Sequence, residues 1–175
     1  MKKLVILFVI AFLLAFCKKN ESADPYIGTF NIQFEAGTNS LFFVNNGGNP
    51  GITSTTAGEW KIENDGKGRY TLTPINDQSR ILSSANGTYV SLITRSATLT
   101  NNELFTFEPT TDKNIVNFKS VASNKYIVYQ YGLMSNGNIC CWAIALDNKT
   151  PCNSDWSSLG AHTSNCQYDF MLIKK

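Results

Sequence analysis

Two nine-residue stretches, Ile81-Leu-Ser-Ser-Ala-Asn-Gly-Thr-Tyr89 and Phe118-Lys-Ser-Val-Ala-Ser-Asn-Lys-Tyr126, align without a gap. In both, an apolar residue opens the stretch, Ser and Ala share positions, and Tyr closes it. Ile32-Gln-Phe-Glu-Ala-Gly-Thr-Asn-Ser-Leu41 is a third copy with one extra residue. A small repeated unit cannot bury its apolar face alone, so the copies must pack against one another.

Each copy is followed by a similar ending, which contains an acid, an aromatic residue and a second apolar residue. The three endings are Gly58-Glu-Trp-Lys-Ile62, Glu103-Leu-Phe-Thr-Phe107 and Tyr168-Asp-Phe-Met-Leu172. The second apolar residue follows the aromatic residue by two positions, which places both side chains on one face of a strand.

Short runs of alternating apolar and polar residues dominate the chain after Cys17, and such runs predict β-strands. The predicted strands are 30–34, 59–62, 70–72, 105–107, 115–118 and 126–129. Turn signals rich in Asn and Gly lie between them, at 46–51, 64–68, 86–87 and 135–137. After Cys17 no segment of ten or more residues has helical apolar periodicity. We therefore predict an all-β chain.

Three copies of a roughly 40-residue, four-stranded unit resemble a β-trefoil, and the acid-x-Phe endings are most similar to the fascin-like branch. The resemblance covers about residues 27–175, with repeats at about 27–66, 67–112 and 113–175. It implies a closed barrel without open strand edges. It also implies two sets of equivalent core positions: Trp60, Phe105 and Phe170, and Leu41, Tyr89 and Tyr126. A β-propeller is the alternative, but three blades are too few for one.

The composition sets limits on partners and chemistry. The chain has 175 residues, enough for one domain with a sizeable core. Only 16% of them are charged, and removal of Lys2 and Lys3 would leave 13 basic and 13 acidic residues. A neutral chain lacks the excess of basic residues that binds nucleic acid, so we expect no nucleic-acid partner. The single His leaves little for His-based catalysis or metal binding.

The pattern at the amino terminus is typical of an export signal. Met1-Lys2-Lys3 precede an unbroken apolar run of 13 residues, 4–16. A membrane-spanning helix needs about 20 such residues, and the shorter run suits the core of a secretory signal. An ordinary secreted protein is one interpretation, but no A-x-A cleavage site lies nearby, since Glu21-Ser22-Ala23 begins with a charge.

The end of that run, Leu14-Ala15-Phe16-Cys17, resembles the lipobox of bacterial lipoproteins. Phe16 departs from the usual Gly, Ala or Ser, as the looser boxes of spirochaete lipoproteins do. The resemblance implies a signal peptide at 1–16, a lipidated Cys17, and a polar tether over 17–26 before the trefoil domain. We accordingly expect a lipid-anchored protein of the bacterial cell envelope, at the outer membrane or cell surface, with no cofactor besides the covalent lipid.

Four further cysteines, Cys140, Cys141, Cys152 and Cys166, all lie in the last 36 residues. Export to an oxidising compartment favours two disulfides. Cys140 and Cys141 are adjacent, and on a regular strand they would point to opposite faces. We therefore expect one to pair with Cys152 and the other with Cys166, in an order that the sequence leaves open. A zinc site of four thiolates is the alternative, but the spacing fits it badly.

The third repeat carries an insertion of about 20 residues, a length typical of functional or disordered loops. It contains Trp156, Asp155 and Asn153 beside the lone His162, which we take as candidate ligand-binding residues. Sugars stack on exposed indoles, but the Q-x-W motif of ricin-type lectins is absent. We expect Trp142, by contrast, to pack in the core.

These observations favour a binding module whose repeat-three loops contact a glycan or an extracellular protein. The alternative is a structural or protease-inhibitor-like envelope protein that contacts another protein. We do not expect an enzyme, because no nucleophile elbow accompanies His162 and the acids Glu59, Glu103 and Asp169 sit at repeat-equivalent positions that should not converge.

Overall fold

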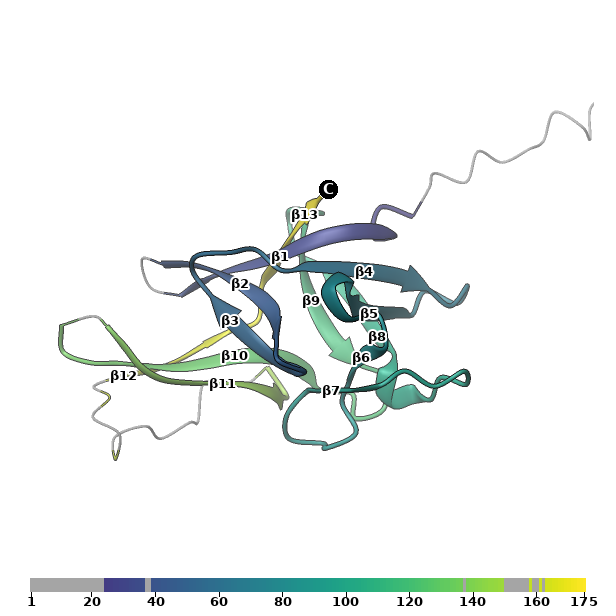
Figure 1. Cartoon of the computed structure of the whole chain (residues 1–175). Helices are drawn as coiled ribbons and strands as arrows, with labels where there is room; N and C mark the ends of the chain where they lie inside the picture. The colour runs from purple at the N-terminus through teal and green to yellow at the C-terminus, as the bar shows by residue number, and fades with distance from the viewer. Residues whose placement is uncertain (1–23, 37–38, 137, 150–157, 159–160, 162) are drawn as a thin grey trace, which may run out of the picture.

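The computed structural model describes residues 24–36, 39–136, 138–149, 158, 161 and 163–175 (Figure 1). Within these residues the chain forms strands β1 to β13 and two single-turn 3-10 helices, η1 (Ile75–Asp77) and η2 (Asn101–Glu103). The all-β prediction is confirmed, and each of the six predicted strands lies inside an observed one. Among the described residues no helix is long and apolar enough to cross a membrane.

Six strands close a barrel. They are β1 (Gly28–Ala36), β4 (Glu59–Asn64), β5 (Tyr70–Pro74), β8 (Phe105–Pro109), β9 (Ile115–Ser120) and β13 (Phe170–Lys174). Each pairs antiparallel with the next, and β13 pairs with β1 to complete the circle. This closure fits the β-trefoil that the sequence repeat predicts.

Three hairpins join the barrel strands. They are β2 (Asn39–Asn46) with β3 (Asn49–Thr53), β6 (Arg80–Ser83) with β7 (Ser91–Thr94), and β10 (Tyr126–Leu133) with β11 (Ile139–Asp147). The turn between β2 and β3 uses Gly47 and Gly48, whose φ angles of 59° and 90° favour glycine. The third repeat also has an extra strand, β12 (Thr163–Gln167), which pairs with β10 (Figure 1).

Aromatic side chains fill the barrel. Trp60, Phe105 and Phe170 are buried, as the repeat predicts. Trp60 stacks on Phe43 with ring centroids 4.7 Å apart and donates its indole N–H to the Phe43 carbonyl. Phe118 stacks on Phe170 at 4.9 Å. Other ring contacts join different repeats, since Phe34 lies 5.5 Å from Phe170 and Phe107 lies 4.8 Å from Phe118, so the core belongs to the closed barrel as a whole.

The prediction that Tyr89 is a core residue is wrong, since 50% of its surface is exposed. Its backbone bridges to Ala145, and the next residue, Val90, takes the buried position. Tyr126 is likewise only half-buried, whereas the following Ile127 is buried. The repeat thus aligns outward-facing tyrosines, and the apolar residue after each one enters the core.

Residues at the chain's entry to the barrel pack against it, although the sequence assigns them to the tether. The carboxylate of Asp24 accepts hydrogen bonds from the amide of Asn64 at 2.7 Å and the hydroxyl of Tyr70 at 2.9 Å. Burial, together with Asp24, raises the pKa of Tyr70 to about 12. Tyr26 packs edge-on against Tyr70 and Phe107, at 5.9 and 5.5 Å. The position of residue 24 is therefore fixed relative to the barrel.

Candidate functional site

A groove with a volume of about 300 Å³ crosses the outer wall of the barrel where β1, β9 and β13 lie side by side. Strand pairing places Gln33 opposite Met171, and Met171 opposite Ile115, in one row over three strands. Side chains alternate along a strand, so this row faces outward while Ile32, Phe170 and Val116 face the core. The groove is lined by Gln33, Phe34, Glu35, Thr110, Thr111, Ile115, Gln167, Asp169 and Met171.

Asn117 orders Asp169, the acid on one side of the groove. The side chain of Asn117 is almost fully buried, and its amide donates to Oδ1 of Asp169 at 2.6 Å and to the carbonyl of Tyr168 at 3.0 Å. Its own oxygen accepts from the ammonium of Lys149. Both ends of the amide are thus engaged, which fixes the direction of the hydrogen bond to Asp169.

Glu35 supplies the second acid, from β1. Its Oε1 accepts from the hydroxyl of Ser40 at 2.7 Å and from the amide of Gln33 at 3.1 Å. Gln33 also donates to Ser40 at 3.1 Å. The three side chains form a closed polar network on exposed surface, which orders this carboxylate without burying it.

The groove combines hydrogen-bonding groups with an apolar floor. Ile115 is half-buried, and Met171 is 37% exposed beside it. Carboxylates accept from hydroxyl groups, and amides both donate and accept. Neither lysine nor arginine lines this groove. The arrangement suits an uncharged ligand with many hydroxyls and an apolar face, and it disfavours an anion.

A second polar cluster, Glu108, Lys119 and Tyr126, lies beside Asn117 on the same wall. The hydroxyl of Tyr126 donates to Glu108 at 2.7 Å, and the ammonium of Lys119 lies 3.4 Å from the other carboxylate oxygen. The hydrogen bond from Tyr126, aided by the charge of Lys119, holds the pKa of Glu108 below its usual value. That same bond to Glu108 raises the pKa of Tyr126. Lys149 lies 5.3 Å from the centre of the Tyr126 ring, so the cluster connects to the groove through Asn117.

The three repeat-equivalent acids have different surroundings. Glu103 is buried and accepts from the backbone N–H and the hydroxyl of Thr100, at 2.7 and 2.9 Å, in a capping box. Glu59 is exposed on β4, and only Asp169 lines the groove. The described residues contain no group of three or more His, Cys, Asp or Glu side chains that would hold a metal.

The candidate residues Asn153, Asp155, Trp156 and His162 lie outside the described residues, so their role stays a prediction. Trp142 does lie within them, and the expectation that it packs in the core is wrong, because 44% of its surface is exposed. It sits on β11, at the edge of the sheet, opposite Tyr131. Among the described residues β11 pairs with β10 on one side and has one isolated bridge, Ala145 to Tyr89, on the other, so part of the indole stays uncovered.

The predicted disulfide pairing is not shown. Cys152 and the side chain of Cys141 lie outside the described part of the chain. Cys166 is disulfide-bonded, but its partner is not among the described side chains. Cys140 lies where the pairing of β10 with β11 shifts register, and its Sγ contacts the carbonyl oxygen of Gly132 at 3.6 Å. Side chains do not alternate strictly between faces at such a bulge, so the expected opposite orientation of Cys140 and Cys141 does not follow.

Of the groove residues, the sequence singles out only Asp169 as a candidate, and as a repeat-equivalent acid rather than as part of a groove. Glu35, Ile115 and Met171 are far apart in the chain and have no common motif. The available signal is the alternation along these strands, which sets Gln33 and Ile115 on the face opposite the core residues Ile32 and Val116. That signal identifies an outer surface, but closing the barrel is needed to bring these strands together.

Comparisons with known proteins identify the fold and no family. No protein-family model matches the chain, and no curated protein matches its sequence. Among solved structures, the designed threefold-symmetric protein ThreeFoil is 11% identical, with a TM-score of 0.53, over 84% of this chain and 99% of its own. SeviL bound to asialo-GM1 saccharide is 19% identical, with a TM-score of 0.53, over 85% of this chain and 98% of its own. The cytolethal distending toxin of Haemophilus ducreyi is 11% identical, with a TM-score of 0.54, over 83% and 82%.

The fold is β-trefoil-like. The six-stranded closure and the similar structures agree on this point. At sequence identities of 11–19% the similarity concerns the fold alone, so the resemblance to the fascin-like branch stays an expectation.

Proposed function

We propose that this protein is a lipid-anchored binding module of the bacterial envelope and that its outer groove binds an uncharged glycan. The observation that carries the proposal is the groove itself. Two ordered carboxylates, Glu35 and Asp169, face a floor that contains Ile115 and Met171. Sugar hydroxyls would donate to the carboxylates while the C–H face of the ring covers the floor.

A structural neighbour supports a saccharide as the ligand. SeviL has a similar fold and was solved with the asialo-GM1 saccharide bound. In this chain we propose that the insertion residues Asn153, Asp155, Trp156 and His162 complete the contact from the third repeat, which also supplies Ile115, Asp169 and Met171. We propose binding without catalysis, for the reasons that the sequence gives.

A glycan array tests the proposal with the exported chain from residue 17 and two near-isosteric variants, Asp169→Asn and Glu35→Gln. Glu59→Gln is the matched control, because Glu59 is an exposed acid on β4 that does not line the groove. Loss of a charged acceptor leaves a ligand hydroxyl poorly paired, which costs about 1–3 kcal/mol. We therefore expect at least about fivefold weaker binding for each groove variant and no change for the control. Equal binding by all four proteins would place the glycan elsewhere.

Exposed Trp142 supports a second candidate function, contact with another protein. Tryptophan is enriched among residues that dominate protein interfaces. This candidate corresponds to a structural or protease-inhibitor-like envelope protein. It predicts that the wild-type protein binds no glycan on the array but binds a purified extracellular protein or protease. It also predicts that Trp142→Ala abolishes this protein binding and that Asp169→Asn does not.

A further inference from the structure

A second cavity, with a volume of about 360 Å³, lies at the end of the barrel where the chain enters and leaves it. Strand pairing places Phe30, near the start of β1, opposite Lys174 at the end of β13. The turn between β8 and β9 joins them, because Asn114 accepts from the backbone N–H of Leu172. The lining of this basal cavity includes Tyr26, Phe30, Lys113, Asn114, Leu172 and Lys174.

The chemistry of the basal cavity is opposite to that of the groove. Two lysines, Lys113 and Lys174, lie at its exposed rim, while buried Phe30 and Leu172 form apolar walls. No carboxylate lines it. Among the described residues, neither lysine takes part in an ion pair. A phosphate carried on an apolar chain matches both features, since lysine binds phosphate as a point charge.

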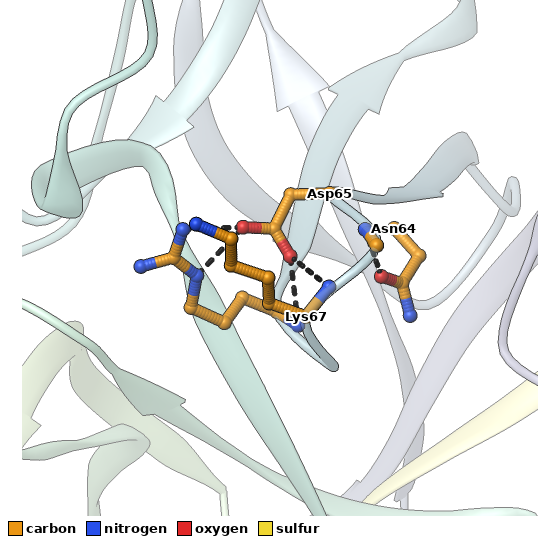
Figure 2. A network of polar contacts seen from close by, with 5 residues as sticks. Asn64, Asp65 and Lys67 are labelled. Carbon is orange, nitrogen blue, oxygen red and sulfur yellow. Dashed lines mark hydrogen bonds and ion pairs between the residues drawn. The ribbon is translucent and has the colours of Figure 1, made fainter.

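The acids near this end are already engaged within the protein. Asp65, in the turn after β4, accepts from the backbone N–H of Lys67 at 2.9 Å and from the Arg69 guanidinium at 2.6 Å. Figure 2 shows Asp65 and Lys67 within this polar network. Desolvation alone would raise the pKa of Asp65, but the hydrogen bonds from Arg69 and Lys67 hold that pKa below its usual value. Asp112 accepts from the backbone N–H of Asn114 at 2.8 Å, within its own turn. The two rim lysines therefore have no acid in the cavity to neutralise them.

The position of Asp24 also limits how far this end can lie from the membrane. Asp24 is bonded to Asn64 and Tyr70, and Cys17 precedes it by seven residues. A fully extended chain spans at most about 3.5 Å per residue, so a lipid on Cys17 would hold Asp24 within roughly 25 Å of the bilayer. This step rests on the lipid anchor of the proposed function. Given that anchor, the basal cavity lies close to the headgroups.

We propose that the basal cavity binds the phosphate headgroup of an anionic phospholipid in the membrane that holds the anchor. Lys113 and Lys174 contact the phosphate from two sides, and Asn114 donates to it. The glycerol end of the acyl chains lies on Phe30 and Leu172. Binding of the headgroup would fix the orientation of the barrel relative to the membrane.

Vesicle co-sedimentation tests this inference with the exported chain from residue 17 carrying Cys17→Ser, so that no acyl chain contributes. The vesicles are phosphatidylcholine with or without phosphatidylglycerol. The variants are the double substitution Lys113→Glu with Lys174→Glu, and the control Lys125→Glu, at the opposite end of β9. A lysine near an anionic surface contributes about 1 kcal/mol, roughly fivefold in affinity, so we expect at least about tenfold weaker binding for the double variant.

The control variant should bind phosphatidylglycerol vesicles as the parent does, and neither protein should bind pure phosphatidylcholine. Equal binding to both lipids, or an equal loss with Lys125→Glu, would overturn the inference. Binding of inorganic phosphate without vesicle binding would overturn it too, since the site would then serve a free anion. Asp169→Asn should retain vesicle binding, so a failed glycan array and a failed vesicle assay are distinguishable.

Discussion

At the scale of single residues, the polar groups of the outer wall hold one another in place before any ligand arrives. The hydroxyl of Tyr126 is the link, since it donates to Glu108 at 2.7 Å while Lys119 and Lys149 lie 5.0 and 5.3 Å from its ring. Lys149 in turn binds Asn117, which orders Asp169. Tyr126 therefore contacts Glu108 through its hydroxyl and Lys149 through its ring, and the bond from Lys149 to Asn117 continues the network to an acid of the groove.

Substitution of Tyr126 by Phe tests this link through the titration of Glu108. The hydrogen bond lowers the pKa of Glu108 in the folded protein, so it stabilises the fold above the ordinary pKa, near 4.5, and this contribution is lost as the pH falls through the folded value. We expect Tyr126→Phe to move the pKa of Glu108 back up, measured by carboxyl carbon NMR. The stability difference from wild type should be larger at pH 7 than at pH 3.

The control for that measurement is Tyr89→Phe, because Tyr89 is the repeat-equivalent tyrosine and is half exposed. It should leave the titration of Glu108 unchanged. An unaltered Glu108 pKa in Tyr126→Phe would show that the bond does not form in solution.

At the scale of strands and hairpins, the sequence predicts which segments form strands better than it predicts which side chains they bury. Alternation identifies six strands correctly because each has apolar residues that must face a core. The expectation that the tyrosines at the ends of the repeats are buried is wrong for a physical reason. A conserved position within a repeat can be an outward one, and in two copies the following residue, Val90 or Ile127, enters the core.

A matched pair of substitutions tests this assignment. Val90→Ala should lower the free energy of unfolding by about 2 kcal/mol, since it removes two buried carbon atoms and leaves a void. Tyr89→Ala should change it by less than about 1 kcal/mol, because an exposed side chain loses little on truncation. Urea unfolding followed by tryptophan fluorescence measures both. A larger loss for Tyr89→Ala than for Val90→Ala would restore the original assignment of Tyr89 to the core.

The candidate site was beyond sequence reasoning because it depends on closure of the barrel. Glu35 and Asp169 line the same groove because β13, at the end of the domain, pairs with β1, at its start. Trp142 was misassigned because an indole in an apolar run usually packs, whereas β11 is an edge strand. Alternation and the threefold repeat nevertheless predict the closed all-β arrangement that the structure has.

At the scale of the whole molecule, two surfaces of opposite chemistry lie on one barrel. The groove on its wall has carboxylates and no cation in its lining, while the basal cavity has lysines and no carboxylate. The chain enters the barrel at the basal end, beside the cavity. The barrel thus has one surface suited to a membrane and another suited to a ligand, provided that the chain is anchored at Cys17.

That anchor gives the last prediction. Wild-type protein expressed in a lipoprotein-processing bacterium should incorporate labelled palmitate and sediment with membranes. Each buried methylene contributes about 0.8 kcal/mol, and a diacylglyceryl group supplies two acyl chains, whereas one chain alone binds only marginally. Cys17→Ala should incorporate no label and remain unprocessed or be released as soluble protein. Cys140→Ala is the control for a thiol elsewhere in the chain and should keep the label. If wild type takes up no palmitate, the chain is an ordinary secreted protein. The glycan groove would then remain testable in solution, whereas the basal cavity would lose the argument that places it against a membrane.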